Sequence, residues 1–329
     1  MNKILTVITT TYRSEIYLEN YFDGILALAG RDTFQFILVM NAPNAEERKI
    51  AFSYYEQYPN LLRIIEVANR ESIGASLNRG FTLVNTPYCS FLDVDDTRTT
   101  DSYIKQIKTL ENHPDADFTY GDFICVSEQG SNKGSYISTI DFCANEFTQG
   151  CHASPTQLFR SSLIKNIGGF DEQYKSGGDF EFQIRAAHNC KFKKTEGPLC
   201  YYSKLPISIS ASSTILQPIE RTAIELRYGL YDKTMELKGY PYVHAARRYR
   251  LDYVLIHGKW QPLEKYVPKY RKMLSKREPF RKAFEKEYRK WLVRHYSDVP
   301  NRTRDAIKWS LAKMGLSEKV RHLKENILS

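Results

Sequence analysis

Short apolar segments that alternate with helix-spaced segments constrain the first two hundred residues more than any other feature. The apolar runs occur at residues 4–9, 34–40, 62–67 and 88–92. Between the last two runs, Ile73, Leu77 and Phe81 recur at helical spacing. Strands that alternate with helices at this pitch predict βαβ units, and therefore an α/β fold with a mostly parallel sheet flanked by helices.

An acidic cluster follows the fourth apolar run directly. In parallel sheets, ligands bind beyond the carboxyl ends of the strands, and Asp93, Asp95 and Asp96 stand at such an end. Three carboxylates within four residues repel one another. A hard cation such as Mg²⁺ or Mn²⁺ relieves the repulsion and also accepts oxygens from a diphosphate. Such tracts also occur in solvated loops, so the position after a buried strand is what favours a binding site.

A second acidic signal lies at the start of a predicted helix. Asp179 follows Gly177 and Gly178, and Arg185 comes two turns later. A carboxylate at a helix N-terminus can be a cap that satisfies backbone N–H groups. It can also be a general base that faces a cleft. The spacing alone leaves both interpretations open.

Five motifs in a fixed order resemble the family 2 glycosyltransferases with the GT-A fold. The resemblance covers about residues 3–212. Its motifs are residues 6–13, the segment from Asn69 through Gly74 to Gly80, residues 91–96, residues 168–172, and residues 178–181 with Arg185. It implies a GT-A type, Rossmann-like sheet and an inverting transferase that uses a nucleotide-diphosphate sugar and a divalent metal ion.

Two loops are the expected nucleotide site, the first of them on the basis of the resemblance. Thr9, Thr11 and Tyr12 match the loop that holds the nucleotide base and ribose. Asn69 and Arg70 lie in the loop after the third strand, near the expected base and phosphates. The alternative for Arg70 is a position on the solvated surface without a ligand.

The carboxylates receive roles on the same basis. Asp93 and Asp95 match the motif that engages the ribose and the metal–diphosphate, and Asp96 matches an additional aspartate, so Asp95 and Asp96 are the expected metal ligands. Asp179 matches the catalytic base. The chemistry agrees, because one base and one metal site suit a single displacement with inversion, whereas retention by double displacement also needs a nucleophile.

The sequence departs from the family pattern at three places. Met40 and Asn41 stand where many members have an aspartate that contacts uracil; Asn41 can still hydrogen-bond a base, and a UDP-sugar is the expected donor. Gly178 replaces the glutamate that often precedes the base. Leu205 stands where a histidine often completes the metal site, so either the metal has fewer protein ligands or Lys204 assists the phosphates directly.

Further side chains are candidates for contacts with the sugar or the acceptor. His152 lies where the acceptor cleft is expected, Asp122 follows a strand, and Glu181 belongs to the motif around the base. A satisfied structural role is the alternative for His152. Asn78 and Gly80 are expected to shape the helix that packs under the donor site.

Charge marks a boundary near residue 214. Residues 1–214 carry 20 basic and 25 acidic side chains, whereas residues 215–329 carry 27 and 13. We therefore expect a GT-A domain at 1–214 and a helical, basic C-terminal domain at 215–329. Its tract at residues 265–282 interleaves aromatic and basic side chains, which suits an anionic membrane surface, the acceptor or self-association. No nucleic-acid-binding motif accompanies the charge, so nucleic acid is not an expected partner.

The remaining features concern compartment and role. The six cysteines form no C-x-x-C pair, and the first residues suit a buried strand better than a signal peptide. These features predict reduced thiols and a cytoplasmic protein. The basic tract adds the alternative of a peripheral protein on the inner face of the membrane.

The expected function is transfer of a sugar to a glycan or lipid-linked acceptor, in bacterial surface polysaccharide synthesis such as lipopolysaccharide or capsule. The polysaccharide setting rests on family analogy. The alternative is a degenerate transferase that serves as a scaffold or binding module.

Overall fold

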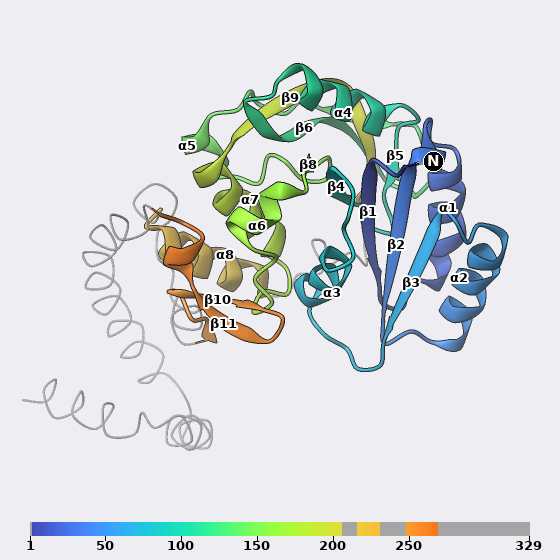
Figure 1. The fold of residues 1–329 in the computed structure, drawn as a ribbon, viewed down its shortest axis with the longest axis horizontal. Coiled ribbons are helices and arrows are strands. Elements are labelled where there is room, and N and C mark those ends of the chain that lie inside the picture. The colour runs from blue at the N-terminus through green and yellow to red at the C-terminus, as the bar shows by residue number, and fades with distance from the viewer. Residues whose placement is uncertain (1, 206–215, 231–247, 269–329) are drawn as a thin grey trace, which may run out of the picture.

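The computed structural model describes residues 2–205, 216–230 and 248–268, and the account below is limited to them (Figure 1). In the described ranges, one large curled sheet carries the fold. Its strands are β1 (Leu5–Thr11), β2 (Phe34–Asn41), β3 (Leu62–Val67), β4 (Tyr88–Phe91), β5 (Thr97–Arg98), β6 (Ala116–Val126), β7 (Gly134–Ile137), β8 (Leu158–Arg160) and β9 (Lys191–Ser203).

The sheet has a parallel half and a mixed half. Its order is β3-β2-β1-β4-β8-β6-β9-β5, with β7 on the outside of β6. The strands β3, β2, β1 and β4 are parallel, as the βαβ pattern predicts. β8 then pairs antiparallel with both β4 and β6, and β6 runs parallel to β9. The carboxyl ends of β1 to β4 therefore meet at one edge.

Helices α1 (Glu15–Leu26), α2 (Ala45–Gln57) and α4 (Ser102–Asn112) cover one face of the sheet. The buried core on this face joins Leu5 and Val7 of β1 to Phe22 of α1 and Tyr103 of α4. Since strand side chains alternate between faces, Thr9 and Thr11 lie on this same face. Figure 1 shows α1 and α2 on one side of β1 to β3, away from α3.

Helices α3 (Ile73–Phe81), α6 (Ser162–Ile167) and α7 (Gly178–Asn189) cover the opposite face. Phe170 stacks on Phe182 of α7, with ring centroids 4.6 Å apart. Gly80 of α3 packs directly against β1, because a Cβ at that position would lie 2.5 Å from Ile8 Cγ2. The short helix α5 (Ala144–Phe147) completes this layer beside α7.

A third cluster joins α7 to the described part of the second half. It contains α8 (Leu216–Tyr228), the hairpin of β10 (Tyr253–Ile256) and β11 (Lys259–Pro262), and Tyr174. Figure 1 shows α8 and the hairpin beneath α6 and α7. Helix α8 buries Ile219, Ala223 and Leu226 in this cluster.

The expectation of helices alone after residue 216 is wrong for the hairpin. Tyr253 pairs with Pro262 and Ile256 with Lys259. His257 and Gly258 form the turn with φ of 50° and 67°, the conformation that two-residue hairpin turns require. Of the predicted basic tract only residues 265–268 are described, and the rest lies outside the described residues.

Two further expectations meet the structure here. All six cysteines lie in described segments and are free thiols. Among the described helices, none is long and apolar enough to cross a bilayer.

Candidate active site

The acidic cluster and Asp179 meet beyond the carboxyl end of β4. Asp93 is exposed at this edge, but protein surrounds it on its other sides. The surrounding protein displaces water from the Asp93 carboxyl, and this is the largest cause of its raised pKa. Repulsion from Asp95 and then from Asp179 adds to the rise, which brings the pKa of Asp93 to about 7. Phe91 at the end of β4 and Asp179 at the N-terminus of α7 line one small hollow, which places Asp179 near the acidic cluster. The structure therefore joins two signals that are 86 residues apart in the sequence.

Asp96 is the buried member of the cluster. Its Oδ1 accepts a hydrogen bond from the backbone N–H of Ser203 at 2.8 Å, which ties the cluster to the end of β9. Its Oδ2 is buried and has no partner among the described residues. Burial, followed by repulsion from Asp93 and Asp95, holds the pKa of Asp96 well above its usual range.

This donor set suits a hard cation that is shared with a ligand. In the described part of the chain, no group of three or more ligating side chains is arranged as a complete metal site. The Asp95 carboxyl is partly exposed, and burial raises its pKa. Mg²⁺ and Mn²⁺ commonly take one or two carboxylates and complete their shell with phosphate oxygens and water. Asp93 and Asp95 fit that arrangement. Asp96, expected as a metal ligand together with Asp95, has one oxygen engaged by Ser203 and the other without a partner among the described residues, so its role as a ligand stays a prediction.

Tyr12 and Arg70 form a planar surface where β1 and β3 end. The Arg70 guanidinium lies over the Tyr12 ring, 4.1 Å from its centroid, and Arg13 approaches the same ring at 5.4 Å. Arg13 has a φ of 53°, so the chain turns sharply after Tyr12. The aromatic ring and the cations suit a nucleobase and its phosphates. The expected neighbours at β1, Thr9 and Thr11, are almost fully buried on the α1 face.

Asn41 holds the loop after β3. Its Nδ2 donates to the Glu71 carbonyl, and its Oδ1 accepts from the Glu71 N–H, both at 3.0 Å. Both ends of the amide are therefore engaged within the protein, and its contact with a base stays a prediction. Asn69, in the same loop, is exposed.

Asn78 plays the same part for the loop that leads to α7. Its Nδ2 donates to the Phe170 carbonyl at 2.9 Å, and its Oδ1 accepts from the Phe170 N–H at 2.7 Å. This agrees with the expectation that Asn78 shapes the structure under the site rather than contacting a ligand.

Asp179 presents its carboxylate at the first turn of α7. Its Oδ1 accepts from the Phe180 N–H at 2.8 Å, and its Oδ2 lies 3.6 Å from Cys151 Sγ, which donates to it. The surrounding protein withdraws water from the carboxyl and raises its pKa. The group borders a small hollow that is lined by three phenylalanine rings and by Ala153, Ser154, Gln157 and Gln183. The N-cap of α7 is Gly177, and Asp179 satisfies one N–H group of the first turn, that of Phe180. A carboxylate with a raised pKa is a stronger base than a free one, and the role of Asp179 as the base stays a prediction.

His152 lies beside this hollow. Gln183 of α7 accepts the backbone N–H groups of His152 and Ala153, each at 2.8 Å, and so fixes the loop beside Asp179. The His152 ring packs against Phe147 with centroids 5.2 Å apart. Partial burial lowers the pKa of His152, which favours the neutral imidazole.

Asp122 is almost fully engaged by the protein. Its carboxylate pairs with Lys194 at 2.8 Å, and it accepts from the Tyr136 hydroxyl at 2.5 Å and from the Thr139 N–H at 2.7 Å. Burial alone would raise the pKa of Asp122, but these bonds outweigh it and hold the pKa low. Asp122 fastens β7 and the following loop to β6, which leaves little capacity for a sugar.

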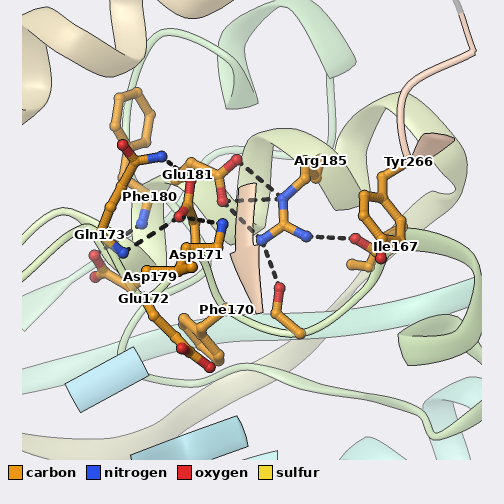
Figure 2. Close-up of polar contacts among 12 residues, drawn as sticks. Ile167, Phe170, Asp171, Glu172, Gln173, Asp179, Phe180, Glu181, Arg185 and Tyr266 are labelled. Carbon is orange, nitrogen blue, oxygen red and sulfur yellow. Dashed lines mark hydrogen bonds and ion pairs between the residues drawn. The ribbon is translucent and has the colours of Figure 1, made fainter. Parts of the chain in front are cut away.

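Glu181 faces the interior rather than an acceptor. Figure 2 shows its carboxylate bonded to the Arg185 guanidinium, which also reaches the carbonyls of Ile167 and Gly169. Glu181 is fully buried, so it offers no surface to an acceptor. Its further partners are the Arg227 guanidinium at 2.9 Å and the Tyr228 hydroxyl at 2.7 Å, both from α8.

Two residues beside Asp179 are additions to the sequence interpretation. Gln183 comes four residues after Asp179, one helical turn along the same face, so helical spacing could have suggested it. No pattern marks Cys151, because its contact with Asp179 spans 28 residues.

Comparison with known proteins gives consistent results at the sequence level. Residues 6–166 match the profile of glycosyl transferase family 2. The chain is 27% identical over 207 residues to an uncharacterized glycosyltransferase of Methanocaldococcus jannaschii. This alignment covers 60% of this chain and 70% of that protein. It is 30% identical over 96 residues to the teichoic acid poly(glycerol phosphate) polymerase of Staphylococcus epidermidis, covering 29% of this chain and 13% of the polymerase.

The fold matches solved structures of S. aureus TarS. The complex of TarS residues 1–349 with UDP-GlcNAc aligns with a TM-score of 0.59 at 17% identity, covering 98% of this chain and 91% of TarS 1–349. Another structure of the same fragment gives a TM-score of 0.55 and covers 74% of this chain and 69% of that one. At this identity the likeness concerns the fold alone, and it agrees with the expected GT-A type sheet.

Proposed function

Because the chain is a family 2 glycosyltransferase, we propose that it transfers a sugar from a nucleoside diphosphate sugar to a hydroxyl group of a glycan or lipid-linked acceptor, with inversion at the anomeric carbon. The observation that carries this proposal is that Asp179 and the end of β4, which leads into the acidic cluster, border the same hollow. A base and the expected diphosphate site would then both be within reach of one sugar.

Asp179 acts as the general base in this proposal. Its carboxylate takes the proton of the acceptor hydroxyl as that oxygen forms a bond to the anomeric carbon. The bond between the anomeric carbon and the diphosphate oxygen breaks, and the electron pair leaves with the diphosphate. One displacement at one carbon inverts its configuration. The hydrogen bond from Phe180 N–H and the contact with Cys151 fix the direction of the carboxylate.

Asp93 and Asp95 would hold the donor through its ribose and diphosphate. A bound Mg²⁺ or Mn²⁺ would supply positive charge to the leaving diphosphate. Without a cation, the carboxylates repel one another and the diphosphate alike. Asp96 accepts the Ser203 N–H, and this hydrogen bond fixes the acidic cluster against the end of β9.

Tyr12 and Arg70 would hold the nucleotide, with a UDP-sugar as the expected donor. The solved TarS complexes with UDP and UDP-GlcNAc support this class of donor. The similarity to a teichoic acid polymerase supports an acceptor in cell-surface glycan synthesis. Cytoplasmic location and contact with an anionic membrane stay predictions.

A thermal-shift panel tests the proposal. UDP, GDP, dTDP and CMP are added to the full chain with and without Mn²⁺, since a ligand that binds the native state raises Tm by mass action. One diphosphate should raise Tm only with Mn²⁺. Asp95→Ala should remove the shift, and Asp115→Ala, at an exposed aspartate paired with Lys191, should keep it. No shift with any nucleotide would contradict the proposal.

A further inference from the structure

The loop in front of Asp179 is anchored by a carboxylate from α8. Glu220 is fully buried. Its Oε1 accepts from the Lys175 N–H at 2.8 Å, and its Oε2 accepts from the N–H groups of Ser176 and Gly177 at 2.6 and 2.8 Å. The Tyr249 hydroxyl adds a fourth bond at 3.0 Å. A carboxylate offers about four acceptor sites, so this one is saturated.

The anchored residues lead directly into the catalytic turn. Gly177 is the N-cap of α7 and Asp179 is the second residue of that helix. A negative charge is favourable at this end because the free N–H groups of the first turn and the helix dipole are positive there. Backbone N–H bonds to a charged acceptor are also stronger than neutral ones. Glu220 therefore sets where α7 begins and where the Asp179 carboxylate stands.

Packing reinforces the anchor. A Cβ on Gly177 would lie 2.9 Å from Ile224 Cδ1 and 3.4 Å from Glu220 Cβ, so glycine allows the loop to lie flat on α8. About two turns after Glu220, the Arg227 guanidinium bonds to Asp171 and Glu181 at 2.7 and 2.9 Å, which fixes α8 against α7. Helix α8 thus contacts the chain both before and after Asp179, through Gly177 and through Glu181.

We propose that Glu220 is a positioning residue for the general base, and that α8 is part of the catalytic apparatus rather than an appendage. This inference rests on the proposed function of Asp179. Glu220 acts only through the backbone of residues 175–177 and does not touch the reacting groups. The donor site lies on other elements, so Glu220 governs the chemical step and not donor affinity.

Glu220→Gln in the full chain tests this assignment. Glutamine keeps the shape of the Glu220 side chain, but its NH2 group replaces one of the two oxygens that accept the backbone N–H groups. Turnover at saturating donor should fall about 10- to 100-fold, since small displacements of a reacting group cost this much. The Kd for UDP with Mn²⁺ should stay within about threefold. The matched control is Glu225→Gln, because Glu225 is also buried on α8 but pairs with Arg221 instead of the loop, and it should retain turnover.

Amide hydrogen exchange gives a readout that does not depend on activity. In Glu220→Gln, the amides of residues 175–177 should exchange at least about tenfold faster, while those of β1 and β2 stay unchanged. Unchanged exchange at 175–177, or turnover within threefold of the unsubstituted chain, would overturn the proposal. If the unsubstituted chain transfers no sugar, the proposed function fails, and the exchange result still decides whether Glu220 anchors the loop.

A second pair of variants covers the case in which Glu220→Gln does not fold. Gly177→Ala should lower turnover several-fold because its methyl group meets Ile224 Cδ1. Ile224→Val removes that atom, so the double variant should recover most of the turnover. Gly177→Ala with undiminished turnover, or a double variant without recovery, would count against the assignment.

Discussion

Replacing Arg227 with methionine should destabilise the chain more than any exposed substitution. Arg227 is fully buried on α8. Its guanidinium bonds to Asp171 at 2.7 Å and Glu181 at 2.9 Å, and it donates to the Tyr253 carbonyl at 2.7 Å. Methionine fills similar space but supplies no charge and no donor. Glu181 keeps Arg185, whereas Asp171 loses the cation that faces it.

The magnitude follows from the charge left behind. Removing one partner of a buried ion pair costs about 3–5 kcal/mol. Burial already raises the pKa of Asp171 and Arg227 opposes that shift, so the variant drives the Asp171 pKa further up. Protonation of Asp171 then limits the cost, which places the expected loss near about 3 kcal/mol. With an unfolding entropy of about 2.1 cal/mol/K per residue, a chain of 329 residues would then lose roughly 4 °C in Tm.

Differential scanning calorimetry or urea unfolding measures the loss, and Arg48→Met is the control. Arg48 on α2 pairs with Glu66 at 2.8 Å, but the two side chains are 46% and 35% exposed, so the loss of this pair should cost about 1 kcal/mol or less. Near-equal losses in the two variants would refute the reasoning. Asp171→Asn combined with Arg227→Met should be less damaging than Arg227→Met alone, because no unpaired charge remains.

Three further predictions concern the donor and the base. The raised pKa of Asp179 means that kcat/KM falls with decreasing pH through a value above 3.8, because the base must be deprotonated; a pH–rate profile with its acid limb below 3.8 would contradict this. Asp93 has a pKa of about 7 without ligand, so Mn²⁺-dependent nucleotide binding should be weaker at pH 6 than at pH 8 in calorimetric titration, and equal affinities would count against it. Arg70→Ala should raise the nucleotide Kd about 5- to 30-fold by removing the cation over Tyr12, with kcat little changed; an unaltered Kd would place the base elsewhere.

The first half of the fold was predictable because its signals are local. The apolar run at residues 62–67 becomes β3 with the same bounds, and the helical spacing of Ile73, Leu77 and Phe81 becomes α3. The hairpin at residues 253–262 was missed, although Gly258 follows the short apolar run 253–256 and is a turn signal. The mixed half of the sheet was not predictable, because pairing such as β8 with both β4 and β6 joins segments far apart in the sequence.

The site divides in the same way. Asp93, Asp95 and Asp179 follow from motifs that sit at strand and helix ends. Asp122 and Glu181 have the right residue type near the right elements, but their neighbours engage them within the protein. Glu220 carried no signal, because its bonds to residues 175–177 cross more than forty residues and use backbone groups, which leave no residue pattern.

The most direct test of the account is Asp179→Asn, with turnover and donor affinity measured on the same preparation. Asparagine keeps the shape and can still accept the Phe180 N–H, but it cannot take a proton at neutral pH. The account predicts a loss of about 10²- to 10⁴-fold in kcat, with the Kd for UDP and Mn²⁺ within about threefold of the unsubstituted chain. Turnover within a factor of a few would show that Asp179 is not the base and would contradict the central claim.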